Sequence, residues 1–208
     1  RRSGARGPAG KRMLTYKVVT APASEPITTE EAKLHCRVDL SDDDVPIAAW
    51  IVAAREEVER QSGMALVSQT LELVLPNWPL GDRIALPRPP LTSVTSVKYK
   101  DKDGAETTWD AANYIAGTDS VPGVLVLAWN ATWPSVDLYP IEPIRIRYVA
   151  GFASAAAVPQ SLKQAMLLLI GQWYENREAG GDTVGEKAGI AFGVDRLIGS
   201  YRAEALGR

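Results

Sequence analysis

The chain has 208 residues, of which 46% are hydrophobic and 23% are charged, as in ordinary globular proteins. Its 23 basic and 25 acidic side chains give a net charge of −2, and every apolar run is shorter than the roughly 20 residues needed to cross a bilayer. A single cysteine and a single histidine exclude a disulfide within the chain and leave too few ligands for a cysteine–histidine metal site.

The start of the chain differs from the rest in charge. Residues 1–12 hold five basic side chains and no acidic one, so the remainder of the chain carries −7. We expect residues 1–13 to be an expression remnant or upstream translated sequence, or else a basic arm that touches nucleic acid or an acidic neighbour.

A short helix is expected near the start of the segment 14–66, which we interpret as the N-terminal helical part. Residues 14–27 are expected to be an extended lead-in. Thr28 or Thr29 can accept hydrogen bonds from the free amides that begin a helix. This helix is expected to end near Val38.

A longer amphipathic helix is expected over residues 44–62. Ser41 or Asp42 can cap its start, and Gly63 suits the left-handed residue that ends it. Apolar residues recur at helical spacing on one face: Ile47, Trp50, Ile51, Ala54 and Val58. Four charged residues are expected largely outside this face: Arg55, Glu56, Glu59 and Arg60.

Residues 67–152 are expected to be rich in β-strands, because apolar residues alternate there with a period of two. Alternating or strongly apolar runs occur at 69–75, 124–129 and 144–149. The segment 94–109 has an Asp-Gly pair near its centre, which predicts an antiparallel hairpin.

The segment 153–208 is expected to be helical again. We predict a buried helix over residues 160–178, a flexible glycine-rich loop over 179–189 and a terminal amphipathic helix over 193–203. The sequence therefore predicts an α+β fold, with a helical core from the N- and C-terminal segments and residues 67–152 inserted as an antiparallel β-rich subdomain.

Groups suited to catalysis or metal binding are few. His35 and Cys36 are neighbours on a helix, so their side chains diverge and cannot act together as base and nucleophile. Residues 42–44 are three aspartates without the alternating ligands of a calcium loop, and they favour a solvated helix N-terminus. The glycine-rich loop has no phosphate-loop pattern. We expect no catalytic residue, no metal site and no cofactor.

Four tryptophans lie in the β-rich segment: Trp78, Trp109, Trp129 and Trp133. Such side chains can stack on sugars or bases, but proteins that bind single strands combine them with a basic groove. Here acidic and basic residues of the same segment roughly cancel. Packing in the core or contact between subunits is the favoured interpretation.

A series of short motifs follows in order along the chain. They include EPITTEEAK at 25–33, LHCRVD at 34–39, AAREEVE at 53–59, LPRPPL at 86–91, VTSVKY at 94–99, YVAGF at 148–152, LKQA at 162–165 and WYENRE at 173–178. In order and spacing these motifs resemble phage head–tail connector (adaptor) proteins, as found in tailed phages, prophages and gene transfer agents. The resemblance covers residues 14–203 and fits the variant with a β-rich insertion.

The resemblance implies a virion structural protein that is not an enzyme. Its expected place is the head–tail junction, after assembly in the host cytoplasm. The resemblance further implies a ring of about a dozen copies, that is, a dodecameric ring, under the portal vertex, where it extends the DNA channel. Their partners would be further copies of the chain, the portal protein, a stopper or tail-completion protein, and double-stranded DNA that passes through the channel without sequence-specific binding. No membrane is implied.

Two sets of contact residues follow from this interpretation. The long helices, residues 44–62 and 160–178, are expected to form the helical core and to supply lateral contacts between subunits. The residues expected there are Trp50, Arg55, Trp173, Tyr174 and Arg177. Docking to the portal is expected at Leu197, Ile198, Tyr201 and Arg202. A terminal amphipathic helix can equally fold back onto its own core, and this alternative stays open.

A second function class is a monomeric β-rich module with a helical base that binds carbohydrate or another surface. This class predicts exposed tryptophans on one flat face of the molecule. An enzyme is a more distant alternative, because it would need a pair of carboxylates that the spacing does not reveal.

Overall fold

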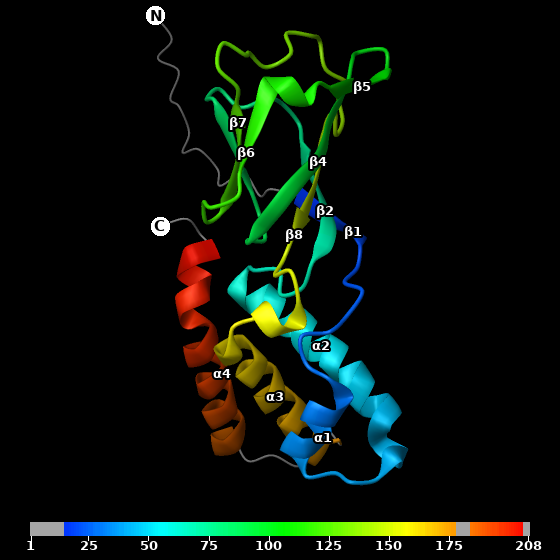
Figure 1. Ribbon diagram of the computed structural model, residues 1–208, viewed down its shortest axis with the longest axis vertical. Coiled ribbons are helices and arrows are strands. Elements are labelled where there is room, and N and C mark those ends of the chain that lie inside the picture. The colour runs from blue at the N-terminus through cyan, green and yellow to red at the C-terminus, as the bar shows by residue number, and fades with distance from the viewer. Residues whose placement is uncertain (1–14, 178–183, 206–208) are drawn as a thin grey trace, which may run out of the picture.

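The computed structural model describes residues 15–177 and 184–205, and Figure 1 shows the helices at one end of an elongated molecule and the strands at the other. The helices are Thr29–Cys36 (α1), Asp44–Ser62 (α2), Gln160–Glu175 (α3) and Val184–Ala205 (α4). The strands are Thr15–Thr20 (β1), Gln69–Leu75 (β2), Arg83–Leu86 (β3), Leu91–Lys100 (β4), Glu106–Trp109 (β5), Tyr114–Gly117 (β6), Gly123–Leu127 (β7) and Ile144–Ala150 (β8). The predicted α+β class is confirmed.

The strands form two antiparallel sheets. The larger sheet has the order β1-β2-β8-β4-β5, and the smaller has the order β3-β7-β6. In the larger sheet Leu73 lies opposite Ile146, and Ile146 lies opposite Val97, so these buried side chains share one face. Their neighbours Arg145 and Arg147 point to the other face, because successive residues of a strand alternate. The predicted alternation is confirmed.

Strand β1 was not predicted. Residues 14–27 were expected to be an extended lead-in, but Thr15–Thr20 pairs with β2 at the edge of the larger sheet. Its sequence, TYKVVT, shows no clear alternation of apolar and polar residues. In the structure Val18 and Val19 are both exposed. The segment before the first helix therefore contributes to the sheet as well as to the helical end.

Helix α1 begins as predicted. Thr28 Oγ1 accepts a hydrogen bond from the Glu31 amide at 3.1 Å, and the Thr28 amide donates to Glu31 Oε2 at 2.7 Å. This reciprocal pair is a capping box, which satisfies two free amides of the first turn. The helix ends at Arg37, which has a left-handed backbone with φ of 57°.

Helix α2 ends as predicted at Gly63, which has a φ of 77°. Its start differs from the prediction. Ser41–Asp43 forms a short 3-10 turn, and neither Ser41 nor Asp42 caps the helix. The residue before the helix is Asp43, whose carboxylate is engaged by α3 and its following residues instead of by the α2 amides.

The C-terminal helices differ from the predicted ones in their bounds. Helix α3 ends at Glu175, whereas 178 was expected. Helix α4 begins at Val184, so residues 184–189 are helical and the prediction of a loop there is wrong. Residues 179–183 of that predicted loop lie outside the described residues. Strong helix formers at 186–188 offset the cost of the neighbouring glycines.

The buried apolar side chains form two separate clusters. The helical cluster lies among the helices and includes Ile47, Ile51, Val58, Leu162, Met166, Ile170 and Ile198. The sheet cluster lies between the two sheets and includes Leu71, Leu73, Leu86, Leu125, Ile144, Ile146 and Tyr148. The two clusters meet where α2 leads into β2, so the contacts at this junction set how the two ends of the molecule are oriented.

Candidate interaction surfaces

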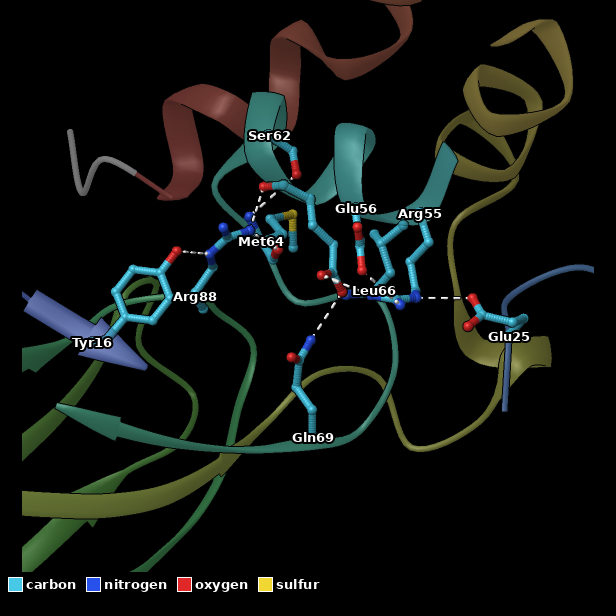
Figure 2. Close-up of polar contacts among 10 residues, drawn as sticks. Tyr16, Glu25, Arg55, Glu56, Ser62, Met64, Leu66, Gln69 and Arg88 are labelled. Carbon is cyan, nitrogen blue, oxygen red and sulfur yellow. Dashed lines mark hydrogen bonds and ion pairs between the residues drawn. The ribbon is translucent and has the colours of Figure 1, made fainter. Parts of the chain in front are cut away.

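Glu59, in the last turn of α2, joins the helical end to the larger sheet. Figure 2 shows the partners of its carboxylate, namely Arg55, Leu66 and Gln69. Its Oε1 accepts hydrogen bonds from the Leu66 amide at 2.8 Å and from the side-chain amide of Gln69, the first residue of β2, at 2.9 Å. Its Oε2 lies 3.3 Å from Arg55 Nη1, and Arg55 also bonds Glu25 at 2.8 Å. Burial raises the pKa of the Glu59 carboxyl above its usual value.

This network places two charged residues of α2 inside the subunit. Arg55 is 6% exposed and Glu59 is 7% exposed, although both were expected outside the apolar face. Buried charges are tolerated where partners satisfy them, and here the partners come from the lead-in and from β2. Arg55 therefore belongs to the interior of the subunit.

Arg88 strengthens the same junction from the loop before β4. Its backbone has a φ of 65°, which turns the side chain toward the end of α2. The guanidinium donates to the Tyr16 hydroxyl and to the backbone carbonyls of Glu59 and Met64. Carbonyls at a helix C-terminus lack partners within the helix and carry a partial negative charge, so a cation is favourable there.

At the opposite end of α2, three of the expected lateral residues come together. Asp43 Oδ2 accepts a hydrogen bond from the Tyr174 hydroxyl at 3.0 Å and lies 2.8 Å from Arg177 Nη2. The Arg177 guanidinium lies 4.7 Å from the Tyr174 ring centroid and 5.6 Å from that of Trp50. The Arg177 hydrogen bond, followed by that of Tyr174, holds the pKa of Asp43 below its usual range.

These contacts assign a position to each expected lateral residue. Tyr174 and Arg177 contact Asp43, and Trp50 packs against both of them. Trp173 packs half-buried against the helical cluster, and Arg55 lies in the interior. The described contacts of these residues are all within one subunit. Their role between subunits stays a prediction.

The expected docking residues on α4 largely face their own core. Ile198 is fully buried, and Leu197 packs against the helical cluster. Tyr201 accepts a hydrogen bond from Ser161 Oγ at 3.2 Å, and Arg202 Nε donates to the Gln61 carbonyl at 3.0 Å. The alternative in which the terminal helix packs on its own subunit is therefore the arrangement in this structure. Contact of these four residues with a portal stays a prediction.

The solvent-facing side of the larger sheet carries a charged row that the sequence analysis did not identify. The Glu72 carboxylate lies 2.9 Å from Lys17, 2.8 Å from Arg147 and 3.9 Å from Arg145. Burial alone would raise the pKa of Glu72, but the neighbouring positive charges of Lys17 and Arg147 outweigh it and lower the pKa. Glu72 thus lies among three cations, one of which, Arg145, also faces Glu142 at 3.8 Å.

The tryptophans of the β-rich segment are mostly packed against one another. Trp78 stacks on Trp133 with ring centroids 5.0 Å apart, and Trp109 lies 5.3 Å from Trp133. Trp129 is the exception, at 92% exposed. The flat face of exposed tryptophans that a carbohydrate-binding module requires is therefore absent from the described part of the chain.

Several exposed apolar side chains lie in the α1–α2 region and in the loops between strands. Near the α1–α2 connection they are Leu34, Leu40 and Val45. In the loops of the strand end they include Leu80, Trp129 and Ile141. Scattered exposed apolar residues are normal, but groups of them commonly mark contact surfaces.

The chemical groups considered from the sequence do not assemble into a reactive site within the described residues. His35 is exposed and Cys36 is half-buried, and burial followed by the charge of Glu175 raises the pKa of the Cys36 thiol. Across residues 15–177 and 184–205, no cluster of three histidine, cysteine or acidic side chains could hold a metal ion. No described helix is both long enough and apolar enough to span a membrane.

Sequence reasoning missed the junction residues Glu59 and Arg88. The spacing of Arg55 and Glu59, four residues apart on a helix, could have suggested an ion pair. No comparable local signal exists for Arg88, because its partners lie 24 to 72 residues away along the chain.

Comparison with known proteins assigns the chain to a family. Residues 25–203 match the family model described as head completion protein. A chain in the virion of a native gene transfer agent (GTA) particle is 30% identical, with a TM-score of 0.73 and coverage of 90% of this chain and 94% of that one. No curated protein matches the sequence.

Two neck structures of gene transfer agents are similar to the same degree. A chain in the neck of an empty particle, computed with C6 symmetry, is 30% identical with a TM-score of 0.74, covering 90% of this chain and 95% of that one. A chain in the neck of a native particle, computed with C12 symmetry, is 30% identical with a TM-score of 0.71, covering 91% and 94%. The chain therefore belongs to the head completion protein family and is a head–tail connector of the virion.

Proposed function

We propose that this connector works as a closed ring of identical copies around a channel for double-stranded DNA. The observation that carries the proposal is the 30% identity over about nine-tenths of the chain to a protein from particle necks computed with C6 and C12 symmetry. A ring requires two different, complementary surfaces on each copy, because each copy contacts one neighbour on either side. The distinct ends of α2 offer two such surfaces.

The ring would act by contact alone, without chemical catalysis. Its family role is structural, and the charged side chains described above bond to one another at the junction and at the far end of α2. The connector would let DNA pass through its channel without binding a specific base sequence. A net charge of −2 favours passage of the duplex, since each added phosphate contact would hold it back.

The portal protein on one side and a stopper or tail-completion protein on the other are the proposed partners. For the portal contact we favour the solvent-facing side of α4 over the residues expected from the sequence, because those residues largely face their own core. Phe192 and Arg196 are exposed on that side, whereas Ile198 anchors α4 to the helical cluster. We propose that Phe192 and Arg196 contact the portal while Ile198 supports them.

The test is to mix the purified chain with portal-bearing heads and to examine the product by electron microscopy and native mass measurement. Rings of the chain seated under the portal are expected. Phe192→Ser should reduce attachment, whereas Thr107→Ser, exposed on strand β5, should not. A chain that stays single at high concentration and ignores portal-bearing heads would contradict the proposed function.

A further inference from the structure

A cavity of about 410 Å³ opens at the C-terminal end of α2. Three arginines from three parts of the chain line it, namely Arg60 on α2, Arg88 before β4 and Arg202 on α4. Tyr16 and Pro87 supply apolar surface. Among the described residues that line the cavity, none is acidic. The cavity thus combines positive charge with an apolar wall.

The three arginines differ in how far their charge is already balanced. Arg60 pairs with Glu57, and Arg202 lies 3.0 Å from Asp195. The hydrogen bonds of Arg88 go to neutral oxygens, namely one hydroxyl and two backbone carbonyls. The site therefore keeps about one unit of positive charge, which suits a carboxylate.

The opposite end of α2 carries an acidic turn with an exposed apolar side chain. Asp39 and Asp42 are exposed, and between them Leu40 is 71% exposed. The next two aspartates are held within the subunit, because Asp43 bonds to α3 and Asp44 lies 2.7 Å from Lys33. The segment 39–42 is therefore available for contact with another molecule.

Helix α2 separates these two features as a rigid spacer. Its 19 residues, at a rise of about 1.5 Å each, span about 28 Å. Figure 1 shows the helix running obliquely, with the α1–α2 connection at one end and α4 beside the other. The acidic turn of a molecule thus cannot reach its own cavity, but it can reach the cavity of a second molecule.

We propose that the acidic turn of one copy occupies the cavity of the next copy in the ring. Leu40 would pack against Tyr16 and Pro87, while Asp42 would pair with Arg88, whose charge is not balanced within the subunit, and would lie beside Arg60. The contact is head-to-tail, so repeating it with rotation closes a ring. This inference rests on the ring proposed above. Its occupant is another copy of this chain, because the turn at 39–42 offers the carboxylates and the exposed apolar side chain that match the arginines and the apolar wall of the cavity.

Cysteine crosslinking in assembled particles tests the contact directly. In a Cys36→Ser background, Asp42→Cys and Arg60→Cys are combined in one chain, and purified particles are oxidised. Disulfides between neighbours should produce a ladder of dimers, trimers and larger species on a non-reducing gel. Each single-cysteine chain should stay largely monomeric. The matched control pair is Asp103→Cys with Arg60→Cys, which takes its acidic position from a distant exposed turn.

Charge reversal gives an independent measurement on the purified chain with portal-bearing heads. Arg60→Glu should raise the concentration needed for half-maximal ring assembly about tenfold, because it places like charges together. Adding Asp42→Arg should restore assembly. Arg83→Glu, an equal charge change at an exposed residue of β3, should leave assembly unchanged.

The outcomes separate the two proposals. If rings form normally, no disulfide-linked species appear and Arg60→Glu does not change assembly, the proposed contact is wrong but the proposed ring still stands. Crosslinking of the cavity cysteine to a different neck protein would also overturn it, since the occupant would then be another protein. Failure of the wild-type chain to enter particles or form rings would instead overturn the proposed function.

Discussion

Glu59 and Gln69 share a buried hydrogen bond of 2.9 Å that ties the last turn of α2 to the first residue of β2. The same carboxylate holds the Leu66 amide and faces Arg55. One side chain thus fixes the segment that links the helical cluster to the sheet cluster. In the connector, this junction therefore sets how the helical end and the strand end of the subunit are oriented.

Replacing Glu59 by glutamine should destabilise the subunit strongly. The change keeps the size of the side chain but leaves Arg55 without its buried carboxylate on α2, and loss of one partner of a buried ion pair costs about 3 kcal/mol. Urea unfolding followed by circular dichroism would measure the loss. Glu56→Gln is the matched control, because Glu56 is exposed and should change the unfolding free energy by less than about 0.5 kcal/mol. Equal losses in both variants would contradict a special role for Glu59.

Two glycines should respond in opposite directions to alanine. Gly151, which follows β8, has a φ of 113°, and an added Cβ would lie 2.3 Å from the Val67 carbonyl oxygen. Gly151→Ala should therefore lower the unfolding free energy by at least about 2 kcal/mol. Gly199 lies within α4 with no atom within 4 Å of an added Cβ, so Gly199→Ala should raise it by about 0.5 to 1 kcal/mol. Thermal unfolding of both variants gives the comparison, and a tolerated Gly151→Ala would refute the close approach.

The contact around Asp43 should depend on pH in the acid range. Because the Arg177 and Tyr174 hydrogen bonds lower the pKa of Asp43, its contribution is complete above the ordinary carboxyl value of about 3.9. It is lost as pH falls through the lower pKa of the folded state. The stability difference between wild type and Asp43→Asn should therefore be present at neutral pH and vanish in strong acid.

Unfolding curves at several pH values would test this dependence. Asp42→Asn is the matched control, since Asp42 is exposed in the same turn, and its stability difference should stay close to zero throughout. A difference between wild type and Asp43→Asn that persists unchanged into strong acid would contradict the assigned contacts.

The tryptophans should separate into structural and surface side chains. Trp109 is 9% exposed in the sheet cluster, so Trp109→Ala should cost about 3 kcal/mol or more. Trp129 is 92% exposed, so Trp129→Ala should change the unfolding free energy by less than about 0.5 kcal/mol. Guanidinium unfolding measures both. A large loss for Trp129→Ala in the isolated subunit would mean that it packs where the structure shows it exposed.

The elements that the sequence predicted correctly are those governed by local signals. The capping box at Thr28, the glycine end of α2 at Gly63 and the hairpin within 94–109 each depend on residues close together in the chain. The apolar alternation in β2 and β8 was also predicted from the sequence, because one face of each strand lies against the sheet cluster.

The parts that the sequence did not predict depend on distant partners. Strand β1 forms through backbone pairing with β2. Its own side chains do not alternate clearly, so the sequence gives no local signal for it. Arg55 and Glu59 were expected to face solvent. They are buried because Glu25 and Gln69, which are distant in the sequence, form hydrogen bonds with them. The apolar face of α4 could pack against its own core or against another protein. The periodicity of the sequence does not distinguish these two arrangements.

The separate burial of the helical and sheet clusters has a consequence for how the subunit loses its structure. A cavity opened in one cluster, for example by Ile170→Ala, need not loosen the other, because no described side chain belongs to both clusters. Calorimetry of such a variant should then resolve two melting transitions where the wild type shows one. The strand end would survive as a folded remnant after the helices have melted, and the polar junction decides how tightly the two events are coupled.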